Sequence, residues 1–126
     1  MKKILLVEDN ELYRILVKEV LEMDNYQIRV VNDGEEALSA LKSESFDLVL
    51  TDIALPKLNG IELTQKIREQ EKKRPKKSRQ KIIAMTADLQ TKDGKSFEEI
   101  DFDGFIQKPF KIQDFRNYVE SIIGNL

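Results

Sequence analysis

Residues 46–60 read FDLVLTDIALPKLNG, a stretch that carries an acidic side chain out of an apolar run and into a loop. The apolar run at residues 48–50 is typical of a short strand that is buried on both faces of a sheet. Asp52 therefore falls at the carboxyl end of that strand, which is the edge where ligands bind in open α/β sheets. Pro56 and Gly60 predict a loop before the next helix. We expect Asp52 to be the working residue of the chain.

Further strand patterns, each followed by a helical pattern, flank this stretch. Strands are predicted at residues 2–7, 28–31, 81–85 and 104–107. Helices are predicted over residues 11–23, 34–41, 61–68, 89–100 and 112–123. Five strands alternating with five helices predict a single α/β domain over residues 1–126, with a doubly wound parallel sheet covered on both faces.

The helical patterns differ in how well their ends and faces are marked. Asn10 can cap the first helix, and Asp33 and Glu36 stand at capping-box spacing before the second. Gly94 interrupts the fourth helical pattern. The first helix has an apolar face at i, i+3, i+4 spacing, made of Tyr13, Leu16, Val17, Val20 and Leu21.

Composition excludes several classes of function. The formal net charge is −2, with Lys+Arg 21 against Asp+Glu 23, so nothing attracts the chain generally to nucleic acid or to an anionic membrane. The apolar runs are too short for a transmembrane or signal segment, which predicts a soluble, cytoplasmic protein. Because the chain has no Cys and no His, zinc sites and histidine catalysis are excluded, and any metal must be a hard cation bound by oxygen.

The segment from Lys66 to Lys81 is rich in basic residues and is broken by Pro75. No aromatic residue is interleaved with these charges, which disfavours a base-stacking surface. We interpret the segment as a helix end followed by a solvated loop, with a docking patch for an acidic partner as the alternative.

Five polar side chains fall at the carboxyl ends of the predicted strands: Glu8, Asp9, Asp52, Thr86 and Lys108. Three neighbouring carboxylates remain ionised at low cost only if a cation neutralises them, and Mg²⁺ suits an oxygen site that also receives phosphate. Asp52 could then act as a carboxylate nucleophile and form an aspartyl phosphate. Lys108 and Thr86 would bind phosphoryl oxygens. Thr86 and Lys108 are individually ordinary residues, but the whole set at successive strand ends is hard to attribute to chance.

The motifs at residues 3–10, 52–60, 85–87 and 108–110 resemble those of response-regulator receiver domains, and the resemblance covers essentially the whole chain. It implies a flavodoxin-like fold with strand order 2-1-3-4-5, in which Asp52 is the phosphoacceptor. It also implies that Glu8, Asp9 and Asp52 hold Mg²⁺ together with the backbone carbonyl of Ala54. Thr86 and Lys108 would bind the phosphoryl group, and the Lys108–Pro109 bond would be cis.

The resemblance further implies a switch. Thr86 would move toward the phosphoryl group and Phe105 would rotate inward, which alters the protein-binding face formed by residues 89–100, 104–107 and 112–123. Phe105 lacks a hydroxyl, so only the packing of its ring can change, and a simple core role is the alternative. Ala54 and Asp88 occupy positions that tune the loss of the phosphoryl group in the family.

These features predict a phospho-accepting response regulator in two-component phosphorelay signalling. The donor would be a phosphohistidine on a sensor histidine kinase or a histidine phosphotransfer protein, since the chain has no His. The chain would not be an enzyme beyond its own phosphorylation and dephosphorylation at Asp52, and it would contact neither nucleic acid nor membrane. A stand-alone regulator is favoured, and the receiver domain of a hybrid sensor histidine kinase is the alternative.

Three other classes of protein fit less well. Haloacid-dehalogenase-like phosphatases place a second Asp two positions after the nucleophile, where this chain has Ala54. A flavodoxin-like nucleotide or flavin binder needs a phosphate loop after the first strand, where Glu8 and Asp9 would repel phosphate. A pseudo-receiver that signals only by binding is disfavoured by the complete set of site residues.

Overall fold

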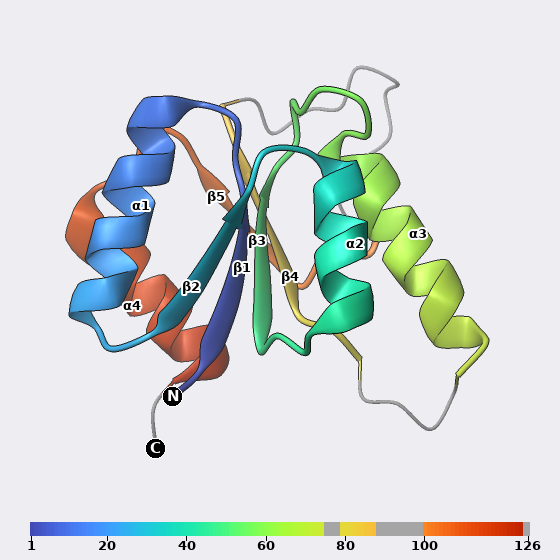
Figure 1. The fold of residues 1–126 in the computed structure, drawn as a ribbon. Coiled ribbons are helices and arrows are strands. Elements are labelled where there is room, and N and C mark those ends of the chain that lie inside the picture. Colours follow the sequence, from blue (N-terminus) through green and yellow to red (C-terminus); the bar gives the residue numbers. More distant parts are fainter. Residues whose placement is uncertain (75–78, 88–99, 125–126) are drawn as a thin grey trace.

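A five-stranded parallel sheet forms the centre of the structure, a computed structural model that describes residues 1–74, 79–87 and 100–124 (Figure 1). The strand order is β2-β1-β3-β4-β5, and every neighbouring pair is parallel. The predicted strand order and fold class are therefore confirmed. The strands are β1 (Lys3–Val7), β2 (Gln27–Val31), β3 (Leu48–Asp52), β4 (Ile82–Thr86) and β5 (Gly104–Gln107).

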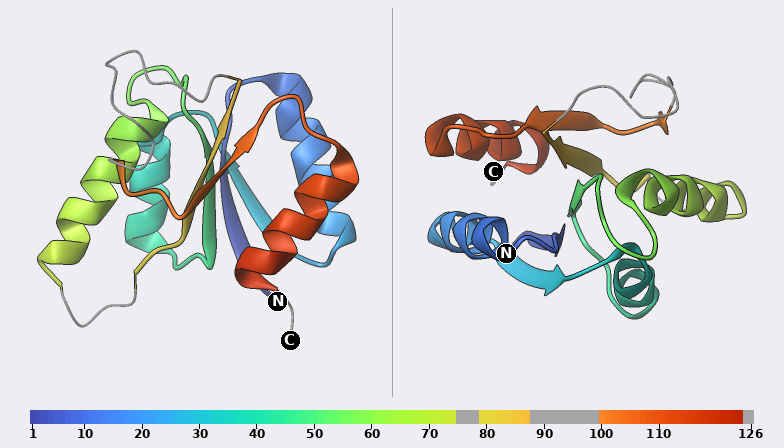
Figure 2. Two further views of the ribbon diagram at one scale, coloured as in Figure 1. Left: turned by 180° about the vertical axis from the view of Figure 1, so that it is seen from behind. Right: turned by 90° about the horizontal axis from the view of Figure 1, so that it is seen from above.

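The described residues contain four helices, two on each face of the sheet (Figure 2). The helices are α1 (Glu11–Met23), α2 (Gly34–Ser43), α3 (Gly60–Lys72) and α4 (Ile112–Ile123). Helices α1 and α4 cover one face, whereas α2 and α3 cover the other. The helix predicted between β4 and β5 falls almost entirely on residues 88–99, which lie outside the described residues. None of the helices described combines the length and the apolar composition that a membrane crossing requires.

The central strands are apolar between their ends because both of their faces are covered. In β1, Ile4 and Leu6 point into the core beneath α1 and α4, while Leu5 and Val7 point into the core beneath α2 and α3. All four side chains have no exposed surface. Successive side chains of a strand alternate between the two faces of a sheet, so a strand covered on both sides has no place for a polar residue. The first polar positions come where the strands end.

Side-chain caps fix where the first two helices begin. The side chain of Asn10 accepts a hydrogen bond from the Tyr13 amide at 3.1 Å, as the sequence predicts. Only half of the predicted capping box of α2 forms: Asp33 accepts from the Glu36 amide at 2.9 Å, but the Glu36 carboxylate accepts from the amide of Asn32. The chain before α2 is extended, which brings the Asn32 amide within reach of Glu36.

An ion pair joins the end of α1 to α4. The Asp24 carboxylate accepts from Arg116 Nη2 at 2.6 Å and from Arg116 Nε at 2.9 Å. This pair of hydrogen bonds holds the pKa of Asp24 below its usual range, although partial burial opposes the shift. The contact ties together the two helices that cover one face of the sheet.

Replacing Asp24 by asparagine is expected to lower the free energy of unfolding slightly near neutral pH. A carboxyl group whose pKa is depressed in the folded state stabilises the fold above the pKa of the unfolded chain, and this contribution is lost as the pH falls through the folded value. The difference between wild type and Asp24→Asn should therefore shrink below about pH 4. Urea unfolding across a pH series measures it, and a difference that is constant with pH would contradict the assignment.

Arg68, on α3, is a second point of attachment between distant segments. Its side chain is only 9% exposed. The guanidinium donates to the carbonyls of Asp101 and Gln80 at 3.2 and 2.7 Å, and to the carboxylates of Glu71 and Asp103, both at 2.9 Å. The interpretation of the basic segment as wholly solvated is therefore wrong for Arg68. Its position just inside the helix end lets it span to the segments that lead into β4 and β5.

Candidate active site

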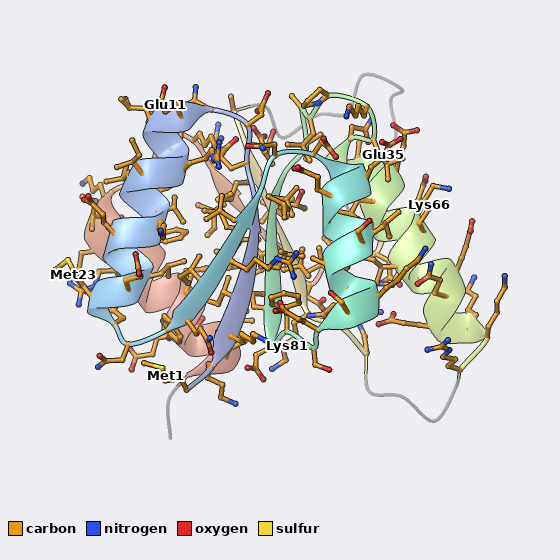
Figure 3. The ribbon with its side chains drawn as sticks, in the orientation of Figure 1. Met1, Glu11, Met23, Glu35, Lys66 and Lys81 are labelled. Carbon is orange, nitrogen blue, oxygen red and sulfur yellow. The ribbon has the colours of Figure 1, made fainter. Side chains whose placement is uncertain are left out.

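The parallel topology gathers the predicted site residues at one edge of the sheet. Val7 of β1 is paired with Thr51, and Asp52 of β3 is paired with Met85, so neighbouring strands end nearly level. Thr86 closes β4, and Lys108 follows β5 directly. In Figure 3 this edge is marked by Glu11, the first residue of α1, whereas Lys81 marks the opposite edge.

Three carboxylates meet at this edge. One oxygen from each of Glu8, Asp9 and Asp52 lies within 4.8 Å of the others. Glu8 is buried, Asp52 is partly buried and Asp9 is exposed, so the cluster is closed toward the core and open toward solvent. Hard oxygen donors with an open, hydrated side fit Mg²⁺, which binds proteins through few carboxylates and keeps several waters.

Lys108 lies against the acids. Its Nζ is 2.5 Å from Glu8 Oε1 and 3.3 Å from Asp52 Oδ2, and the side chain is 10% exposed. The Lys108 amide donates to the Thr86 carbonyl at 2.7 Å, which fixes the start of the loop to the end of β4. The Lys108–Pro109 bond is cis, as the resemblance implies. A single cation therefore faces two of the three carboxylates.

The electrostatics of Glu8 reflect this crowding. Burial raises the pKa of Glu8 above its usual range, and the nearby charge of Asp52 raises it further, while the hydrogen bond from Lys108 opposes both. A raised pKa means that the ionised form of Glu8 is less favourable in the folded protein than in water. Added positive charge at the cluster would make that form more favourable.

The loop after β3 is held by close backbone contacts. The Gly60 amide donates to the Ile53 carbonyl at 3.0 Å, and a Cβ on Gly60 would lie 2.3 Å from the Asp52 carbonyl oxygen. Glycine is therefore required where α3 starts beside Asp52. The Leu58 carbonyl accepts from the Gly34 amide at 3.1 Å, which attaches the loop to α2. These contacts restrain the segment that runs from Asp52 through Ala54.

The remaining predicted site residues differ in how far they are buried. Thr86 is buried at the end of β4. Ala54 is exposed in the loop, and the role of its carbonyl stays a prediction. Phe105 is 43% exposed, so the alternative that it is simply a core residue is wrong. Asp88 lies outside the described residues.

One residue at the site was not identified from the sequence. The ring centroid of Tyr13 lies 4.1 Å from Lys108 Nζ. The sequence pattern assigns Tyr13 to the apolar face of α1, and its ring indeed packs against Phe110. The available signal was its position, since Tyr13 is in the first turn of the helix that follows Glu8 and Asp9.

Comparisons with known proteins agree with this geometry. The model of the response regulator receiver domain family matches residues 4–120. The transcriptional regulatory protein PhoP of Bacillus subtilis, named for alkaline phosphatase synthesis, is 34% identical over 122 residues, which are 97% of this chain and 48% of PhoP. The chain thus spans about half the length of PhoP and smaller shares of the histidine kinases that it matches.

Two solved structures extend the comparison. The receiver domain of a sensor histidine kinase from Pseudomonas aeruginosa PAO1, with a magnesium ion coordinated in its active site cleft, is 31% identical, with a TM-score of 0.84 and coverage of 98% of both chains. The response regulator TrrA of Thermotoga maritima, in complex with Mg²⁺ and beryllofluoride, is 32% identical, with a TM-score of 0.81 over 97% of this chain and 99% of TrrA. The fold, the acidic edge and the family match over residues 4–120 together show that this chain belongs to the receiver domain family of response regulators in two-component signalling.

Proposed function

We propose that the chain, as one receiver domain over residues 1–126, is a phosphorylation-controlled switch in which Asp52 carries the phosphoryl group. The observation that carries the proposal is the meeting of Glu8, Asp9 and Asp52 within 4.8 Å, with Lys108 in contact with two of them. The donor is a phosphohistidine on a sensor histidine kinase or a histidine phosphotransfer protein. The same chemistry applies to a receiver within a hybrid sensor histidine kinase, and the Pseudomonas aeruginosa neighbour is the receiver domain of a sensor histidine kinase.

The residues that would hold Mg²⁺ are Glu8, Asp9 and Asp52, through their carboxylates, and Ala54, through its carbonyl. When bound, the ion supplies the positive charge that lets an acidic site receive an anionic phosphoryl group. The partly buried carboxylate of Asp52 is the nucleophile. Asp9 is exposed, which leaves the solvent side of the cluster accessible to the donor.

In the transfer, an oxygen of the Asp52 carboxylate forms a bond to phosphorus as the bond from phosphorus to the donor imidazole nitrogen breaks. The imidazole leaves with the electron pair of that bond and recovers a proton from solvent. The ammonium of Lys108 binds one phosphoryl oxygen, and the hydroxyl of Thr86 donates to another. Hydrolysis of the aspartyl phosphate returns the switch to its first state, so no other substrate is turned over.

The output would be a change in a protein-binding face that includes β5 and α4. The described part of this face exposes Phe105 at 43% and Ile112 at 46%. An inward rotation of Phe105, coupled to movement of Thr86, would remove apolar surface from the face and alter its affinity for a partner protein. We place this switch in the cytoplasm, with protein partners rather than nucleic acid or membrane.

Incubation with acetyl phosphate tests the proposal without a partner protein. In Mg²⁺, intact-protein mass spectrometry should detect one added phosphoryl group, which hydroxylamine removes because it is an acyl phosphate. Excess chelator should abolish the labelling. Labelling that is equally fast in chelator, or that survives hydroxylamine, would contradict the proposal.

A further inference from the structure

The aromatic ring of Tyr13 forms one wall of the space that holds the Lys108 ammonium. Lys108 Nζ lies 4.1 Å from the ring centroid, within the range of a cation–π contact. The contact joins α1 to the loop after β5, two segments far apart in the chain. It lies on the same ammonium that contacts Glu8 and Asp52.

The ring of Tyr13 is itself held in place. It packs against Phe110 with the ring centroids 5.8 Å apart and the planes tilted by 57°. Phe110 in turn stacks on the buried Phe115 of α4, at 4.7 Å and 16°. The backbone amide of Tyr13 donates a hydrogen bond to the side chain of the cap residue Asn10 at 3.1 Å. The ring is therefore a fixed surface, whereas the lysine side chain is long and flexible.

The three contacts of the ammonium differ in kind. Glu8 and Asp52 are charged and can bind a metal ion, so their hold on Lys108 competes with any cation at the cluster. The face of an aromatic ring attracts an ammonium through its quadrupole and does not coordinate Mg²⁺. The attraction of the ring therefore persists when the carboxylates are engaged elsewhere.

We propose that Tyr13 is a positioning residue that keeps the Lys108 ammonium beside Asp52 while the phosphoryl group arrives. This inference rests on the proposed function of Asp52 and adds a role that α1 plays in the chemistry. Without the ring, the ammonium would sample positions away from the phosphoryl oxygen, and the transfer to Asp52 would slow.

Two substitutions of Tyr13 distinguish the effect of the aromatic ring from the effect of side-chain size. Tyr13→Leu keeps an apolar side chain but removes the quadrupole, and it should lower the rate constant for phosphorylation by acetyl phosphate about 3- to 30-fold. Tyr13→Phe keeps the ring and should retain most of the wild-type rate. Leu12→Ala is the matched control, because Leu12 is on the same turn and 76% exposed. A small donor is used so that docking of a partner protein does not enter the measurement.

A second readout reports the contact directly. Ring currents should shift the NMR signals of the Lys108 ε-methylene protons upfield in wild type and in Tyr13→Phe, and the shift should be lost in Tyr13→Leu. These shifts show whether the ring lies over the ammonium in solution, and the phosphorylation rates show whether that contact matters for the transfer. Urea unfolding checks that each variant is folded, and Tyr13→Met replaces the leucine variant if that variant is unstable.

The outcomes are distinct. Wild-type phosphorylation rates in Tyr13→Leu or its methionine substitute would overturn the inference and leave the proposed function intact. Equal losses in the phenylalanine and leucine variants would also overturn it, because a ring without the hydroxyl would then not sustain the rate. Failure of the wild-type protein to label would overturn the proposed function and this inference together.

Discussion

Replacing Asp52 by asparagine is expected to abolish Mg²⁺-dependent phosphorylation of the chain, because we assign the phosphoryl group to the Asp52 carboxylate. The amide of asparagine has nearly the shape of the carboxylate but neither its charge nor its nucleophilic oxygen. The remaining acids cannot substitute, because Glu8 is buried against Lys108 and Asp9 is on a different strand end. We expect labelling to fall to the background of the assay.

Asp47→Asn is the matched control for this experiment. Asp47 precedes the same strand at the opposite edge of the sheet, where its carboxylate accepts from the Lys3 amide at 2.8 Å. It should label with acetyl phosphate at the wild-type rate. The assignment fails if Asp52→Asn still acquires a hydroxylamine-labile phosphoryl group, or if both variants lose labelling equally.

The second large effect concerns stability. Arg68→Met should lower the free energy of unfolding by about 3 kcal/mol, because Arg68 is the buried cation that pairs with the partly buried carboxylates of Glu71 and Asp103. The Gln80 carbonyl would lose its Arg68 donor at 2.7 Å, and Asp103 would lose a bond at 2.9 Å. The Asp101 carbonyl would keep only the hydrogen bond from Arg79 Nη2 at 3.2 Å. Methionine keeps most of the length of the side chain, so the loss reports the guanidinium rather than a cavity.

Arg79→Met provides the comparison within the same network. Arg79 also donates to Asp101 and Asp103, but its side chain is 46% exposed. Exposed ion pairs contribute little, so we expect a loss of less than about 1 kcal/mol. Urea unfolding of the two variants measures both values. Equal losses would show that burial of Arg68 is not what makes its contacts stabilising.

Much of the fold follows from the sequence because both faces of the sheet are covered. A strand such as residues 48–50 can then be recognised as a short apolar run, and its first polar residue marks the edge where it ends. The order of the strands does not follow from such runs, because each run is compatible with several neighbours. That order came from the resemblance to receiver domains, and the structure confirms it.

The candidate site could be predicted where its residues follow the ends of strands, and was missed where they do not. Glu8, Asp52 and Lys108 stand at ends that a parallel sheet brings together. Tyr13 was missed because helical spacing already explains an aromatic residue there as part of an apolar face. The basic segment that contains Arg68 was interpreted as solvated because local composition does not reveal that Asp101 and Asp103, more than thirty residues away, are two of its partners.

The central claim is that a hard metal ion converts a cluster of acids into a site for an anionic phosphoryl group. Titration calorimetry with beryllofluoride, a mimic of that group, tests it most directly. Binding is expected in the presence of Mg²⁺, with no binding in excess chelator and none to Asp52→Asn with Mg²⁺. Binding that is equally tight without a divalent ion, or that is unchanged by the loss of the Asp52 carboxylate, would contradict it.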